Sequence, residues 1–87
     1  MELKTSFNQS QEEVKSLTSR PSNNELLSLY AYYKQSVDGD VTGKRPGMMK
    51  IKDRAKFDAW SAIKGTSQEN AMKEYISIVE KLKSTYS

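Results

Sequence analysis

The chain has 87 residues, contains neither cysteine nor histidine, and carries 14 Lys+Arg against 11 Asp+Glu, a formal net charge of +3. Without cysteine and histidine, the sequence excludes disulfide bonds, Ser-His-Asp and Cys-His catalysis, and the commonest metal ligand. Since this length suits one domain, we expect residues 1–87 to form a single domain that is not an enzyme and needs no cofactor or metal.

The first predicted helix ends at Arg20-Pro21, because the residue before a proline avoids the helical conformation. Ser6 and Gln9 form a possible capping box near its start. Its apolar face comprises Leu3, Phe7, Val14 and Leu17.

A second helix follows, with Ser22 as its cap and Glu25 as the partner in a capping box. The sequence DGD at 38–40 ends it. At helical spacing, its apolar face comprises Leu26, Leu27, Tyr30, Tyr33 and Val37.

Residues 38–50, DGDVTGKRPGMMK, hold three of the four glycines and one of the two prolines, which predicts a long loop. The third helix covers about residues 52–64 and ends at Gly65. Its apolar side comprises Phe57, Trp60 and Ile63.

Thr66 is the predicted cap of the fourth helix, with Glu69 at the reciprocal position. Because four amphipathic helices are joined by turns and one loop, we predict an all-α bundle. The apolar stripe of the fourth helix comprises Met72, Tyr75, Ile76, Val79, Leu82 and Tyr86.

Three of these helices each carry a lysine beside the apolar face. Lys15 flanks the face of the first helix, and Lys34 shares an arc with Tyr30 and Tyr33. Lys56 lies about 40° from Trp60 on the third helix. Each lysine alone is consistent with a stem that packs on the core and an ammonium group in water. If the three converged beside the tyrosines, they would instead form a cationic, ring-lined pocket for a phosphorylated ligand with an aromatic base.

Other binding functions have weaker support in the sequence. DGDVTG at 38–43 is similar to the start of a calcium-binding EF-hand loop, but Met49 stands where that loop needs a glutamate. The positive net charge is compatible with a helical nucleic-acid- or protein-interaction module, our alternative reading. Basic and acidic residues are interleaved, as in EEVK and MKEY, so we expect no nucleic acid to bind.

Three segments resemble the acyl-CoA-binding protein family in order along the chain. They are RPSNNELLSLYAYYKQSVDGD (20–40), KRPGMMKIKDRAKFDAW (44–60) and KGTSQENAMKEYI (64–76). The resemblance implies an up-down-down-up four-helix bundle that carries medium- to long-chain fatty acyl-CoA for lipid metabolism. It further implies a monomer that makes only transient contacts with acyl-CoA-using enzymes or membranes. Because the sequence has no apolar run long enough to span a membrane and no secretory signal in MELKTSFNQSQEEV, we expect a cytoplasmic protein.

The same resemblance implies a role for each site residue. Tyr30, Lys34 and Lys56 would hold the 3′-phosphate of the CoA ribose, and Tyr33 would lie against the adenine. Lys15 and Tyr75 would complete the polar end of the binding site, which holds the CoA head group. The acyl-chain groove would comprise Phe7, Ser10, Gln11, Asn23, Leu26, Leu27 and Ala55.

The sequence departs from the family at several of these positions. Members usually have alanine at Ser10 and often at Gln11, so the polar pair could change the preferred acyl length. Phe57 replaces a frequent tryptophan. Because Met49 and Lys50 follow the RPGM segment here, we do not transfer the family's details of that loop.

Overall fold

The computed structural model describes residues 2–86, which fold into four α-helices without a strand. The predicted all-α class is therefore confirmed, and residues 39–50 form the expected long loop. No helix in the described part of the chain is both long and apolar enough to cross a membrane. The helices are α1 (Leu3–Lys15), α2 (Asn23–Asp38), α3 (Ile51–Ala62) and α4 (Gln68–Tyr86).

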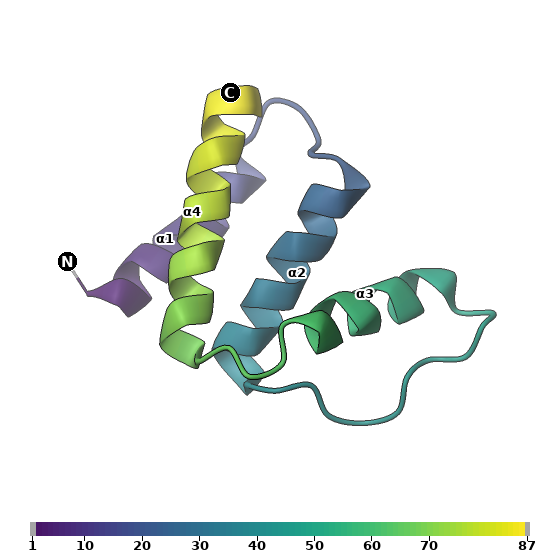
Figure 1. The fold of residues 1–87 in the computed structure, drawn as a ribbon. Helices are drawn as coiled ribbons and strands as arrows, with labels where there is room; N and C mark the ends of the chain where they lie inside the picture. The colour runs from purple at the N-terminus through teal and green to yellow at the C-terminus, as the bar shows by residue number, and fades with distance from the viewer. Residues whose placement is uncertain (1, 87) are drawn as a thin grey trace.

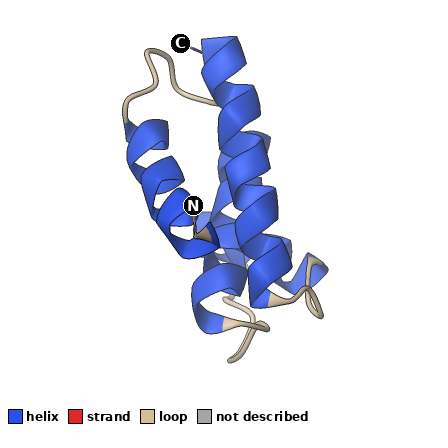
Figure 2. Cartoon of the chain, turned by 90° about the vertical axis from the view of Figure 1, so that its left-hand side faces the viewer, coloured by secondary structure: helices blue, strands red, loops and turns tan. Residues whose placement is uncertain are grey.

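The helices lie side by side in the order α1, α4, α2, α3, because α4 packs on both α1 and α2, and α2 also packs on α3. Figure 1 shows α2 and α4 running in opposite directions, while α3 extends sideways from α2. The domain measures 37 × 28 × 15 Å and is therefore thin in one direction. Figure 2, a view turned by 90°, shows the loops gathered near the ends of the helices.

The core lies mainly where α4 meets α1 and α2. Every third or fourth residue of α4 is buried, as the apolar stripe predicted. Half-buried side chains, including Val14, Leu17 and Ile76, pack around this cluster. The buried cluster consists of Phe7, Leu29, Tyr75, Val79 and Leu82.

The inward face that we predicted for α2 is wrong at its C-terminal end. Tyr33 is 38% exposed and Val37 is 50% exposed. The reason is that α2 packs against α4 on one side and α3 on another, so two faces are covered and a third borders open space. The buried residues of α2 are Leu29, Ala31, Gln35 and Ser36.

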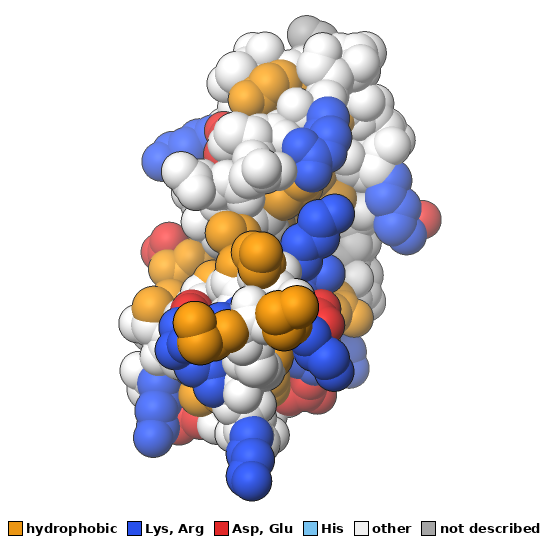
Figure 3. All heavy atoms as spheres, turned by 90° about the vertical axis from the view of Figure 1, so that its right-hand side faces the viewer, with side chains coloured by type: hydrophobic (Ala, Val, Ile, Leu, Met, Phe, Trp, Pro, Cys, Tyr) orange, Lys and Arg blue, Asp and Glu red, His pale blue; other side chains and the backbone are white. Residues whose placement is uncertain are grey.

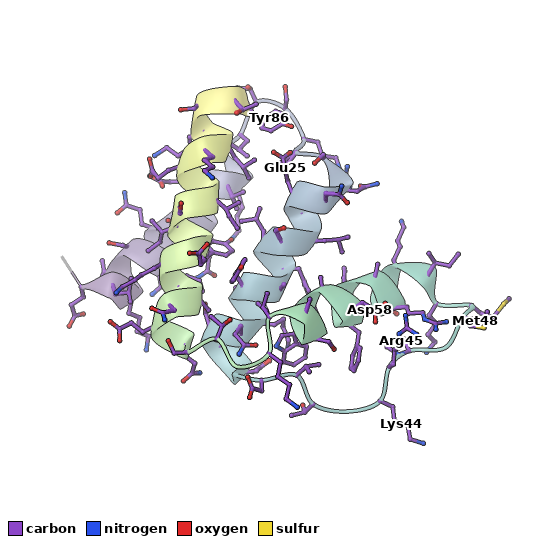
Figure 4. All side chains as sticks on the ribbon, viewed as in Figure 1. Glu25, Lys44, Arg45, Met48, Asp58 and Tyr86 are labelled. Atoms are coloured by element: carbon purple, nitrogen blue, oxygen red, sulfur yellow. The ribbon has the colours of Figure 1, made fainter. Side chains whose placement is uncertain are left out.

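The capping box at the start of α2 is confirmed. The Glu25 N–H donates to Ser22 Oγ at 3.2 Å, and the Ser22 N–H donates to the Glu25 carboxylate at 2.8 Å. The Tyr86 hydroxyl donates to the same Glu25 carboxylate at 2.8 Å, which joins the end of α4 to the start of α2 (Figure 4). The Ser22 N–H, together with the Tyr86 hydroxyl, lowers the pKa of Glu25.

The predicted ends of α1 are wrong. The Ser6 N–H donates to the Glu2 carbonyl at 3.1 Å, so the helix has already begun and Ser6 cannot pair with Gln9 as a capping box. The helix also ends at Lys15, five residues before Arg20. Residues 16–22 therefore form a connection that the proline signal alone did not reveal.

The cap of α4 is Ser67 rather than Thr66, since the Asn70 N–H donates to Ser67 Oγ at 3.0 Å. With Ser67 as the cap, Glu69 is only two residues further on, so the predicted capping box of Thr66 with Glu69 is wrong. Gly65 has a φ of +95°, a conformation that favours glycine, in agreement with its predicted place after α3.

A buried polar cluster around Gln35 fixes the end of α2. The Gln35 side-chain amide donates to the Asp40 carboxylate at 2.8 Å and to the Thr66 carbonyl at 2.7 Å. Its oxygen accepts the Trp60 indole N–H at 3.1 Å, and that N–H also donates to the Gly39 carbonyl at 2.9 Å. The Gln35 side chain thus connects α2 to the 39–50 loop, to α3 and to the connection between α3 and α4.

We expect Asp40 to make the stability of the fold sensitive to acid. The Gly65 N–H and the Gln35 amide lower the pKa of Asp40 below its ordinary value of 3.8. A lowered pKa contributes stability above the ordinary value, and this contribution is lost as the pH falls through the folded-state pKa. Urea unfolding from pH 7 down to pH 2 should therefore show wild type and Asp40→Asn converging in midpoint below about pH 4. A gap that stayed constant over this range would contradict the assignment.

Candidate functional site

A pocket of about 470 Å³ lies between α2 and α3. Its walls are largely apolar, from Leu26, Leu27, Ile51 and Ala55, because both helices present residues spaced three to four positions apart to each other. The volume falls in the usual range for ligand sites in proteins. The polar side chains that complete its lining are Arg20, Asn23, Tyr30, Lys52 and Lys56.

Tyr30 and Lys56 stand at the edge of this pocket and make a cation–π contact. The Lys56 Nζ lies 5.4 Å from the centre of the Tyr30 ring. The same two residues also line a smaller hollow of about 260 Å³, together with Phe57 and Trp60. The apolar pocket and the smaller hollow therefore share the Tyr30–Lys56 pair.

Lys34 reaches this region through Trp60. Its Nζ lies 5.0 Å from the centre of the indole ring, and it forms an ion pair with Asp38 one turn later on α2. The hydrogen bond with Asp38 raises the pKa of Lys34, so the ammonium group stays charged at neutral pH. Trp60 borders the hollow that Tyr30 and Lys56 line, so Lys34 contacts one of the rings of this hollow without lining it itself.

A separate pocket of about 420 Å³ lies between α1, α2 and the start of α4. The Phe7 and Tyr33 rings stack in its wall with centroids 6.2 Å apart. The Tyr75 ring meets Phe7 edge-on at 5.1 Å, and burial raises the pKa of the Tyr75 phenol. Gln11 also lines this pocket.

The predicted site residues therefore divide between the two sides of α2. Tyr30, Lys34 and Lys56 are brought together, and four of the predicted groove residues line the α2–α3 pocket: Asn23, Leu26, Leu27 and Ala55. Of the others, Phe7, Gln11 and Tyr33 line the α1-side pocket. Ser10 is buried at 2% exposure and lines neither pocket.

Lys15 is the predicted residue that the structure leaves apart from this region. It ends α1, its side chain is 73% exposed, and its Nζ lies 2.8 Å from Glu12. The hydrogen bond with Glu12 raises the pKa of Lys15. Among the described helices, α1 has no packing contact with α3, because α4 and α2 lie between them. Lys15 and Lys56 are therefore on the two outer helices of the domain.

Sequence reasoning missed several residues of the α2–α3 region. Arg20 and Lys52 add positive charge to the pocket, and Ile51 adds apolar surface. The helix periodicity could have indicated Lys52 and Ile51, since both lie one turn before the predicted Ala55 and Lys56. It could not indicate the Lys34–Trp60 contact, which depends on how α2 and α3 pack.

The carboxylates of the loop do not form a metal site. In residues 2–86, no three of the Asp and Glu side chains gather in a way that could hold a metal ion. Asp38 pairs with Lys34, while the Asp40 carboxylate accepts from the Gly65 N–H and from Gln35. The two aspartates that suggested an EF-hand thus have other partners.

The arrangement suits an amphiphilic ligand with an anionic end. Apolar walls provide a favourable environment for a hydrocarbon chain. Lysine ammonium groups at the edge can form charge-assisted hydrogen bonds with phosphate oxygens, which are stronger than bonds between neutral groups. An exposed aromatic ring such as that of Tyr33 offers a face on which a base can stack.

Comparisons with known proteins find relatives over nearly the whole chain. The family model "Acyl CoA binding protein" matches residues 4–79. An acyl-CoA-binding protein of Brassica napus is 51% identical over 82 residues, which cover 94% of this chain and 89% of the relative. One of Saccharomyces cerevisiae is 47% identical over 81 residues, covering 93% of both chains.

Solved structures show the same fold. The crystal structure of Oryza sativa acyl-CoA-binding protein 2 superposes with a TM-score of 0.91 at 43% identity and covers 97% of this chain and 93% of that one. The solution structure of the yeast acyl coenzyme A binding protein gives a TM-score of 0.73 at 47% identity, with 93% and 94% covered. The chain belongs to the acyl-CoA-binding protein family.

Proposed function

We propose that this protein binds medium- to long-chain fatty acyl-CoA thioesters without converting them, and acts as a carrier and reservoir of these esters. One structural observation carries the proposal: an apolar pocket between α2 and α3 has the Tyr30–Lys56 pair at its edge and Lys34 nearby. Membership of the family supports the same ligand. The absence of histidine and cysteine from the sequence supports binding over catalysis.

In this proposal the 3′-phosphate of the CoA ribose lies among Tyr30, Lys34 and Lys56. Tyr33 lies against the adenine, and Tyr75 and Lys15 belong to the polar end. For Lys15 this requires the ligand to reach the end of α1, since its ammonium group faces Glu12 in the free protein.

The acyl chain lies along Asn23, Leu26, Leu27 and Ala55 in the α2–α3 pocket. Each buried methylene contributes about 0.8 kcal/mol, so affinity should rise with chain length until the groove is full. Phe7, Ser10 and Gln11 influence chain length from the α1 side in this proposal. Because Ser10 is buried, its influence comes through the packing of α1 rather than through an open groove wall.

We further propose that the carrier is a cytoplasmic monomer, as the sequence predicts, and that it meets membranes or acyl-CoA-using enzymes only transiently. Sedimentation velocity of the purified protein tests the oligomeric state. Subcellular fractionation tests the compartment.

Calorimetric titration with a series of acyl-CoA esters tests the function directly. We expect affinity to increase from octanoyl-CoA to palmitoyl-CoA and to reach about −12 kcal/mol, a nanomolar dissociation constant, for the best ester. The matched control is a single-stranded oligonucleotide, for which we expect no binding at physiological salt. An oligonucleotide that bound and displaced palmitoyl-CoA would favour the nucleic-acid alternative instead.

A further inference from the structure

The three most exposed large apolar side chains in residues 2–86 stand within four positions of one another. Met48 is 79% exposed, Met49 is 95% exposed and Ile51 is 75% exposed. They lie at the end of the 39–50 loop and the first residue of α3. Single exposed apolar residues need no explanation, but a compact group of them often marks a contact surface.

Positive charge is concentrated around this group. Residues 44–56 contain six basic residues and one acidic residue, a net charge of +5, whereas the remaining eight basic and ten acidic residues give −2. Within the described part of the chain, no carboxylate lies within ion-pair distance of Lys44, Lys50 or Lys52. These three ammonium groups are therefore not neutralised by neighbouring side chains.

The loop holds this group away from the body of the domain. Figure 4 shows Met48 at the outer tip of the loop, with Lys44 directed away from the helices. Figure 3, which faces this side of the molecule, shows apolar side chains at the centre with Lys and Arg side chains around them. Arg45 fixes the loop to α3 through two bonds to the Asp58 carboxylate, at 2.7 and 2.6 Å.

We propose that residues 44–52 are a docking surface for an anionic phospholipid bilayer. Unbranched methionine side chains can enter the boundary between headgroups and acyl chains, while the lysines remain among the negatively charged headgroups. Each lysine near such a surface contributes attraction that salt weakens. Residues 44–52 contain no aromatic anchor of the kind that dominates protein interfaces, which favours a lipid surface over a protein partner.

Docking at this surface would also orient the ligand pocket. Ile51 and Lys52 belong to the docking surface and also line the α2–α3 pocket. The pocket would therefore open next to the bilayer, where an acyl chain could pass between lipid and protein. This second step rests on the proposed acyl-CoA function, whereas docking itself does not.

Co-sedimentation with lipid vesicles tests the docking surface in the absence of acyl-CoA. We expect wild type to bind vesicles of 70% phosphatidylcholine and 30% phosphatidylserine, and to bind pure phosphatidylcholine vesicles at least about tenfold more weakly. The double variant Met48→Ser, Met49→Ser should lower binding to the anionic vesicles by about fivefold or more, while Met48→Leu, Met49→Leu retains it. Lys50→Glu should also lower binding about tenfold, whereas the control Lys81→Glu, on α4, should change it less than twofold.

Several results would overturn the docking surface. These are a failure of wild type to bind anionic vesicles, unchanged binding by the serine variant, or an equal loss in Lys81→Glu. Concentration-dependent self-association of wild type that the serine variant abolished would assign the tip to a second copy of this chain instead. Circular dichroism melting confirms that each variant is folded.

Calorimetry without vesicles separates this proposal from the proposed function. Met48 and Met49 do not line the α2–α3 pocket, so the serine variant should bind palmitoyl-CoA as wild type does. If wild type bound vesicles but no acyl-CoA, the proposed function would fail while the docking surface stood. If it bound acyl-CoA but no vesicles, only the docking surface would fail.

Discussion

Lys56→Ala is expected to weaken the binding of palmitoyl-CoA by about 10- to 100-fold, because a hydrogen bond to a charged group contributes about 1.5–3 kcal/mol. The substitution removes the ammonium group that lies 5.4 Å from the centre of the Tyr30 ring at the edge of the α2–α3 pocket. Lys56 forms none of the ion pairs in residues 2–86, so its loss should leave the fold intact. Calorimetric titration measures the affinity directly.

Two further variants are needed to interpret the effect of Lys56→Ala on affinity. Lys34→Ala should weaken binding to a similar extent, although it also leaves Asp38 without its partner. Lys81→Ala is the matched control: Lys81 is exposed on α4, so its removal changes the net charge equally without touching the site. Equal affinities for all three variants would show that the lysines contribute only through overall charge.

Gln35→Leu is expected to have the largest effect on stability, a loss of about 2–4 kcal/mol in the free energy of unfolding. Leucine fills a similar volume but cannot donate to the Asp40 carboxylate and the Thr66 carbonyl, or accept from Trp60. Gln35 is fully buried, so no water replaces these partners at the same position. Chemical denaturation monitored by circular dichroism gives the value.

Gln68→Leu provides the control for this measurement. Gln68 is an exposed glutamine near the same end of α2, and its amide donates to the Ser36 and Val37 carbonyls at 3.2 and 3.3 Å. Because water can satisfy these carbonyls after substitution, we expect a loss below about 1 kcal/mol. A similar loss in both variants would mean that burial of the Gln35 cluster is not what stabilises this end of the domain.

The sequence predicted the number of helices because their apolar periodicity is strong. It predicted the start of α2 because the capping box between Ser22 and Glu25 is a local pattern with a fixed spacing of three residues. It failed at α1 and α4, where several residues nearby could cap a helix. Local hydrogen-bonding preferences do not choose between Thr66 and Ser67. Tertiary contacts decide which of the two residues caps α4. The Thr66 carbonyl accepts a hydrogen bond from the Gln35 side chain, which holds Thr66 outside the helix.

Helix periodicity also could not predict how the site divides around α2. It placed Leu26, Leu27, Tyr30, Tyr33 and Val37 on one face and suggested that this face was core. The core is instead formed by Leu29 and its neighbours, since α4 and α3 cover other sides of the helix. Periodicity identifies the residues that share a face, but the packing of the other helices decides whether that face is core or pocket.

The central claim is that Lys34 and Lys56 bind the 3′-phosphate of the ligand beside an apolar groove. The most direct test titrates two proteins, wild type and a double variant that carries both Lys34→Ala and Lys56→Ala. Each protein is titrated with palmitoyl-CoA and with the 3′-dephospho form of this ester. We expect loss of the phosphate to weaken binding to wild type by about 10- to 100-fold, but to the double variant by less than about threefold. If both proteins lost the same factor, or if wild type bound the two esters equally, the lysines would not hold that phosphate.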